Sequence, residues 1–174
     1  MAEAENGFGT PQGTPTVDVA GQMRALRNGA NWFYWIAGLS VVNSLISLFQ
    51  GTLGFIFGLG VTRIVDVIAA MIVNEGSGPV LLIRIIALGV SMFFAGICVL
   101  FGWLANQKQG WAFLVGMVLY ALDGLLFLLI QDWWDLAFHG FALFCIFQGY
   151  TALRKLKAAV APAAPPQVEY DGGA

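Results

Sequence analysis

Asp123 and His139 are the two side chains of this sequence best suited to acid–base chemistry. A carboxylate and an imidazole can exchange a proton near neutral pH. They lie on either side of a short polar turn, residues 131–135, within an otherwise very apolar stretch. His139 is the only histidine, which excludes haem or di-iron sites that need several histidines. The pair therefore marks the place where chemistry is most expected.

Two further polar side chains, Asn43 and Arg84, also lie in apolar segments. With a rise of about 1.5 Å per residue, all four groups lie roughly 6–10 Å inside the outer boundary of a membrane. Ionisable groups at such depth usually face other helices and pair with one another. We expect Arg84 to pair with Asp123. The layer is either a buried fastener or a polar pocket open to the outside, and we favour the fastener.

The acidic residues of the turn allow a second interpretation. Asp132, Asp135 and His139 would share one helix face and could hold a divalent metal. Acidic residues at the start of a helix more often cap its free N–H groups and suit its dipole. We therefore expect Asp132 and Asp135 to be helix caps, and we predict neither a metal nor a cofactor.

The composition indicates an integral membrane protein. Of the 174 residues, 59% are hydrophobic and only 10% are charged, whereas a soluble domain has about 25% charged residues. The net charge of −2 and the lack of a long basic run argue against a nucleic-acid partner. The lipid bilayer is the expected partner, and the fold class is all-α.

The apolar segments predict a four-transmembrane-helix bundle. A helix needs roughly 20 apolar residues to cross the hydrocarbon core. The membrane domain is expected over residues 30–157, between a disordered N-terminal tail, 1–29, and a disordered C-terminal tail, 158–174. The predicted spans are residues 31–49, 80–105, 111–130 and 135–153.

Residues 50–74 are ambiguous. Their first half is rich in glycine, and Thr62 is the expected N-cap of a helix in the second half. Arg63 and Asp66 are one helical turn apart and are expected to form an ion pair. A fifth span would bury both charges, so we expect a re-entrant or interfacial flap on the outer side.

The positive charges next to the spans predict the orientation. With four spans, all of these residues fall on one side, which the positive-inside rule makes cytoplasmic. Both termini are then cytoplasmic, in a bacterial inner membrane or a plasma membrane. The flanking basic residues are Arg24, Arg27, Lys108, Arg154, Lys155 and Lys157.

The arrangement of small residues on the predicted helices indicates helix packing rather than a particular activity. The small-residue faces at Ser40, Ser44 and Ser47 and at Gly89 and Gly96 favour helix packing, within the bundle or between chains. We expect a non-enzymatic accessory or structural subunit that forms homo-oligomers or packs against other membrane subunits. The alternatives are a small oligomeric transporter or channel protomer that uses the polar layer, and a membrane enzyme acting on a lipid or quinone.

Overall fold

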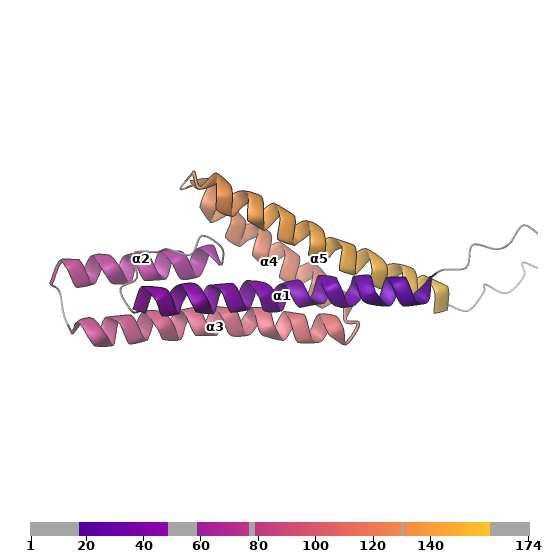
Figure 1. The fold of residues 1–174 in the computed structure, drawn as a ribbon, viewed down its shortest axis with the longest axis horizontal. Coiled ribbons are helices and arrows are strands. Elements are labelled where there is room, and N and C mark those ends of the chain that lie inside the picture. The colour runs from indigo at the N-terminus through magenta and orange to yellow at the C-terminus, as the bar shows by residue number, and fades with distance from the viewer. Residues whose placement is uncertain (1–17, 49–58, 77–78, 130, 161–174) are drawn as a thin grey trace, which may run out of the picture.

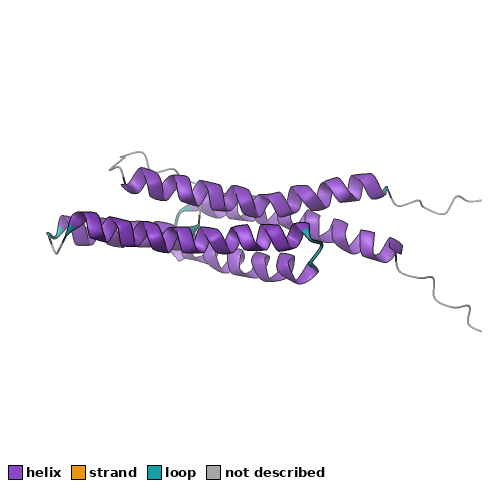
Figure 2. Cartoon of the chain, turned by 90° about the horizontal axis from the view of Figure 1, so that it is seen from below, coloured by secondary structure: helices purple, strands orange, loops and turns teal. Residues whose placement is uncertain are grey.

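The computed structural model describes residues 18–48, 59–76, 79–129 and 131–160. Within these residues, all regular secondary structure is helical, which confirms the all-α prediction (Figure 1). Figure 2 shows the helices as long rods that run roughly along one common axis. The helices are α1 (Val19–Leu48), α2 (Gly60–Asn74), α3 (Val80–Asn106), α4 (Gly110–Leu129) and α5 (Trp133–Val160).

The helices form an elongated bundle in which α1 is central. It packs against α3 on one side and α5 on the other, and α4 packs against α5. The shorter α2 lies beside α3 and contacts α1 and α4 (Figure 1). The start of α1, the α3–α4 turn and the end of α5 lie toward one end of the long axis, and α2 lies toward the other (Figure 1).

Three helices are long and apolar enough to cross a membrane: α3, α4 and α5. Their length and composition indicate a membrane protein. The first predicted span lies in α1, which does not meet the same criterion. Asn31, Asn43 and several serines lower the hydropathy of residues 31–48.

Helix boundaries agree best where turn residues mark them. The predicted spans 80–105 and 111–130 correspond to α3 and α4. By contrast, α1 begins at Val19, inside the predicted N-terminal tail, and α5 continues to Val160. These extensions carry basic side chains that favour a helix but not a hydrocarbon environment, so hydropathy alone ends the spans too early.

The turns before and after α4 each contain one non-glycine residue with a positive φ angle. Lys108 (φ 64°) and Gln131 (φ 57°) adopt the left-handed conformation. The N–H of Asp132 bonds the Phe127 carbonyl at 3.0 Å, and the N–H of Gln131 bonds the Leu128 carbonyl at 3.3 Å. This Schellman pattern ends α4. The α3–α4 turn repeats it around Lys108.

A dry contact, which we call the glycine seam, joins α1 to α5 toward the end where both helices carry their basic residues. It consists of Gly29 and Gly149 with Leu26, Ala30 and Phe113 around them. A Cβ atom added to Gly29 would lie 2.5 Å from the Gly149 Cα atom, so the two backbones touch. The apolar neighbours are at most 1% exposed.

One of the two predicted small-residue faces is buried in the bundle, and the other is exposed. Ser40 and Ser44 are buried within the bundle at 0% and 2% exposure. Gly89 and Gly96 lie on the exposed surface of α3, where an added Cβ would meet nothing within 4 Å. The serine face therefore packs inside the chain, whereas the glycine face of α3 remains outside it.

Candidate functional site

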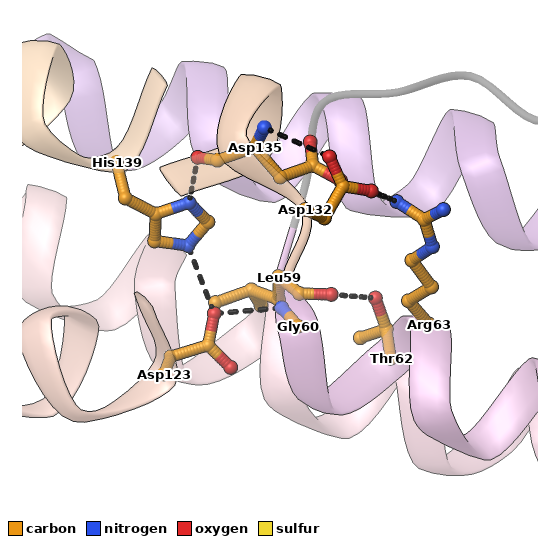
Figure 3. Close-up of polar contacts among 8 residues, drawn as sticks. All are labelled: Leu59, Gly60, Thr62, Arg63, Asp123, Asp132, Asp135 and His139. Carbon is orange, nitrogen blue, oxygen red and sulfur yellow. Dashed lines mark hydrogen bonds and ion pairs between the residues drawn. The ribbon is translucent and has the colours of Figure 1, made fainter. Parts of the chain in front are cut away.

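Asp123 of α4 caps the N-terminus of α2. Its Oδ2 atom accepts the N–H of Gly60 at 2.7 Å, and its Oδ1 atom accepts the N–H of Val61 at 2.9 Å. The first N–H groups of a helix have no partner inside the helix and carry the positive end of its dipole. The N-cap residue, Leu59, supplies no side-chain hydrogen bond. A carboxylate from another helix therefore takes that role (Figure 3).

Close packing makes this cap tight. A Cβ atom on Gly60 would lie 2.8 Å from the Phe127 ring and 3.1 Å from the Asp123 carbonyl oxygen. Only glycine allows the start of α2 to approach α4 this closely. Glycine here thus serves the contact between the two helices rather than flexibility.

His139 of α5 joins Asp123 on the other side. The residue is 1% exposed, and its Nε2 atom lies 3.1 Å from Asp123 Oδ2. Its Nδ1 atom lies 2.8 Å from the backbone carbonyl of Asp135 (Figure 3). A carbonyl only accepts, so Nδ1 carries a hydrogen. Its Nε2 atom faces a carboxyl oxygen, so a hydrogen bond at this contact requires a proton on either Nε2 or Asp123.

Aromatic rings enclose the imidazole. Tyr120 stacks on it with ring centroids 4.3 Å apart and an interplanar angle of 15°. Phe127 lies against it at 4.9 Å. The remaining space is closed by Gly124, where an added Cβ would be 3.2 Å from the ring. The Asp123–His139 bond is therefore shielded from water.

Arg63 of α2 binds the start of α5. Its Nη1 atom donates to Asp132 at 3.0 Å and also bonds Asp135, and its guanidinium lies 5.9 Å from the centre of the Phe127 ring. The Arg63 side chain is 43% exposed, whereas Asp135 is completely buried. Arg63 thus links α2 to the acidic residues at the start of α5 (Figure 3).

Asp132 also caps α5. The Asp135 N–H donates to Asp132 Oδ1 at 3.4 Å, which confirms the predicted N-cap role of Asp132. The Asp135 side chain instead turns to Arg63. We call these five residues, Arg63, Asp123, Asp132, Asp135 and His139, the polar cluster.

Hydroxyl groups of α1 and α2 complete the attachment of α2. The Leu59 N–H donates to Ser40 Oγ at 2.9 Å, and Ser40 Oγ donates to the Ile36 carbonyl at 2.9 Å. Thr62, the expected N-cap, donates its hydroxyl to the Leu59 carbonyl at 2.8 Å instead. The start of α2 is therefore bonded to α1 as well as to α4.

The predicted pair Arg63–Asp66 is replaced by other contacts. Arg63 turns to Asp132 and Asp135, because two carboxylates at the α4–α5 turn attract it more strongly than one neighbour. Asp66 accepts the Ser44 hydroxyl at 3.3 Å. Burial raises the pKa of the Asp66 carboxyl, and the Ser44 hydrogen bond lowers it in part.

Two members of the predicted polar layer, Asp123 and His139, are bonded to each other. Among the described residues, the other hydrogen bonds of Asp123 go to Gly60 and Val61. Arg84 and Asn43 are both half-buried, on α3 and α1. Arg63 bonds Asp132 and Asp135 rather than Asp123. The absence of a capping side chain at Leu59–Gly60 is the sequence signal that a cap must come from elsewhere.

The polar cluster combines three carboxylates with one arginine and one histidine. The positive end of the α2 dipole offsets part of the remaining negative charge. Chemically, this arrangement can hold a proton between Asp123 and His139 and can fasten three helices together. Comparison of the chain with protein-family models, curated proteins and solved structures finds no match.

Proposed function

We propose that this chain is a non-enzymatic membrane subunit that packs against partner helices through the open glycine face of α3. The observation that carries the proposal is the exposure of Gly89 and Gly96 on an apolar helix surface. Small residues one heptad apart allow two membrane helices to approach closely. A structural role of the polar cluster supports the same function, because its bonds join α2, α4 and α5.

Gly89→Leu and Gly96→Leu test the proposal. The full chain is purified in mild detergent, and its assembly is measured by native mass spectrometry. The wild type is expected to retain a stoichiometric partner or a second copy, and each leucine variant is expected to lose it. Gly38→Leu is the matched control, since Gly38 is also exposed on a helix with nothing within 4 Å of an added Cβ. A monomeric wild type, or partner retention in both variants, contradicts the proposal.

The proposed threading has four spans, formed by α1, α3, α4 and α5, with both termini in the cytoplasm. In this arrangement α2 is a re-entrant or interfacial helix whose first residues reach into the bundle. Support comes from the basic residues at the start of α1, in the α3–α4 turn and at the end of α5, because these three parts of the chain lie toward one end of the molecule (Figure 1). Alkaline phosphatase and fluorescent-protein fusions after Gly76 and Lys157 test it. Phosphatase activity at Lys157 contradicts it.

A small proton-linked transporter is the second candidate function. The contact between Asp123 and His139 favours it, since buried ionisable pairs in membrane helices often belong to proton pathways. Flux in proteoliposomes that is abolished in Asp123→Asn and His139→Gln supports this candidate. Absence of any proton-driven flux in the wild type removes it.

A further inference from the structure

A groove of about 410 Å³ lies between α1 and α5, beside the glycine seam. This volume is in the range of sites that bind small molecules, about 300–1,000 Å³. Polar and apolar side chains share its walls, including Arg24, Asn28 and Trp32 of α1 and Cys145 and Gln148 of α5. The three α1 residues follow one another at intervals of four, so they share one helix face along the groove.

One end of the groove lies where the charged part of the bundle begins. Arg24 precedes Gly29 by five residues. On α5, Arg154 is the first basic residue, and it follows Gly149 by five. Gly29 and Gly149 touch and the two helices run in opposite directions (Figure 1), so Arg24 and Arg154 lie at about the same level. Since α5 is apolar enough to cross a membrane, this level corresponds to a membrane surface.

The charge around this end is positive. The six basic residues that flank the predicted spans lie here, with Asp18 as the one acidic residue of the described part of the chain. The Asp18 carboxylate accepts the N–H of Gly21 at 3.0 Å. Arg24 is exposed and forms no ion pair with a described residue. An anion is therefore the complementary ligand for this end of the groove.

The other end of the groove leads onto an apolar surface. Trp32 lies eight residues from Arg24, about 12 Å along the helix axis. Its ring packs edge-on against Phe141 of α5, with ring centroids 5.3 Å apart. Phe141 and Phe144 are 55% and 58% exposed. A free anion would leave this apolar end uncovered, whereas a molecule with an anionic head and an apolar tail covers both ends.

We propose that the groove binds an anionic phospholipid, whose phosphate accepts hydrogen bonds from Arg24 and whose acyl chain lies over Trp32 and Phe141. A guanidinium is a strong donor to phosphate oxygens, and the amides of Asn28 and Gln148 are further donors. The surrounding positive charge favours a lipid of net negative charge over a zwitterionic one. The site is formed by α1 and α5, so it does not depend on a partner at the glycine face of α3.

The test uses the full chain in nanodiscs that contain phosphatidylglycerol and phosphatidylcholine in equal amounts with identical acyl chains. Native mass spectrometry measures which lipid the released protein retains. Retention of phosphatidylglycerol in preference to phosphatidylcholine is expected. Equal retention of the two lipids, or retention of neither, overturns the proposal. Glycerol phosphate, which carries the phosphate without the chains, is added in excess as a competitor. Displacement of the lipid by it overturns the choice of a lipid.

Arg24→Gln removes the cation from the groove. It is expected to weaken retention of phosphatidylglycerol about five- to tenfold, since one basic side chain near a membrane surface contributes about that much. The variant should remain folded, because Arg24 is exposed. Arg27→Gln is the matched control, since Arg27 is exposed on the same helix and is not among the lining residues. Equal losses in the two variants would show only a general attraction to the basic end and contradict the assigned site.

Gln148→Glu places a carboxylate in the wall of the groove. Repulsion between this group and the phosphate is expected to abolish the preference for phosphatidylglycerol. Gln109→Glu makes the same change of charge in the exposed α3–α4 turn at the same end, outside the lining residues, and should leave the preference intact. An unchanged preference in Gln148→Glu, or its loss in both variants, contradicts the assigned location.

Discussion

The glycine seam and the polar cluster hold the bundle together in opposite ways. At the seam, Gly29 and Gly149 bring two backbones into contact among apolar side chains. At the cluster, carboxylates, an arginine and a histidine meet near the start of α2. Lipid is as apolar as a leucine side chain, so burial alone does not drive helices together in a membrane. One region therefore relies on close contact and the other on directed polar bonds.

The difference concerns specificity. Close packing at the seam fixes the distance between α1 and α5. Apolar contacts of this kind would still tolerate a small rotation of one helix against the other. The bonds from Asp123 to the Gly60 and Val61 N–H groups fix one orientation of α2. Polar bonds of this kind can define a single arrangement even where they add little stability. The following variants break or sharpen this comparison.

Asp123→Ala is expected to have the largest effect. It leaves the N–H groups of Gly60 and Val61 and the His139 imidazole without their acceptor, which should lower the free energy of unfolding by about 3 kcal/mol or more. Unfolding in mixed detergent micelles measures the change. Asp66→Asn is the control, because it retains an acceptor for Ser44 and removes a charge whose burial is unfavourable. Equal losses in both variants would refute a special role for Asp123.

Gly29→Ala tests the seam. The added Cβ would lie 2.5 Å from Gly149 Cα, and a backbone atom cannot move aside as a side chain can. We expect a loss of about 1–3 kcal/mol in the free energy of unfolding. Gly140→Ala is the control, since its Cβ meets nothing within 4 Å. It should be neutral or slightly stabilising. A neutral Gly29→Ala would show that the two helices are not in backbone contact.

Removal of the Arg63 side chain should lower the stability of the protein by an intermediate amount, and the loss should depend on whether Asp135 is present. Arg63→Met leaves Asp135 buried without its cation and should destabilise the protein. Adding Asp135→Leu should restore part of the lost stability, because the unpaired charge is then gone. Thermal unfolding of the two single variants and the double variant measures this coupling. Strict additivity would mean that the two side chains do not interact.

Gln131→Gly should have the smallest effect, and in the opposite direction. Gln131 has φ 57°, a conformation that glycine adopts without strain. The substitution should raise the free energy of unfolding by about 0.5–1 kcal/mol. Thermal unfolding checks the sign. A destabilised variant would contradict the left-handed turn at the end of α4.

The sequence predicted the helices that turn residues and hydropathy mark. It placed α3 and α4 closely, and it singled out Asp123 and His139 on either side of the α4–α5 turn. It did not predict that Asp123 caps α2, because a cap from a distant helix leaves no local pattern. Residues 50–58, the first part of the predicted flap, lie outside the described residues. The glycine seam was also missed, since isolated glycines such as Gly29 and Gly149 become informative only when two helices are placed together.

Hydrogen exchange of the Gly60 and Val61 amides tests the central claim most directly. The measurement compares the wild type with Asp123→Ala in lipid nanodiscs, with amides of the α1–α5 seam as the internal reference. If the Asp123 carboxylate fastens the start of α2, both amides are slow in the wild type and at least tenfold faster in the variant, while the seam is unchanged. Fast exchange of both amides in the wild type, or equal rates in the two proteins, would contradict the account.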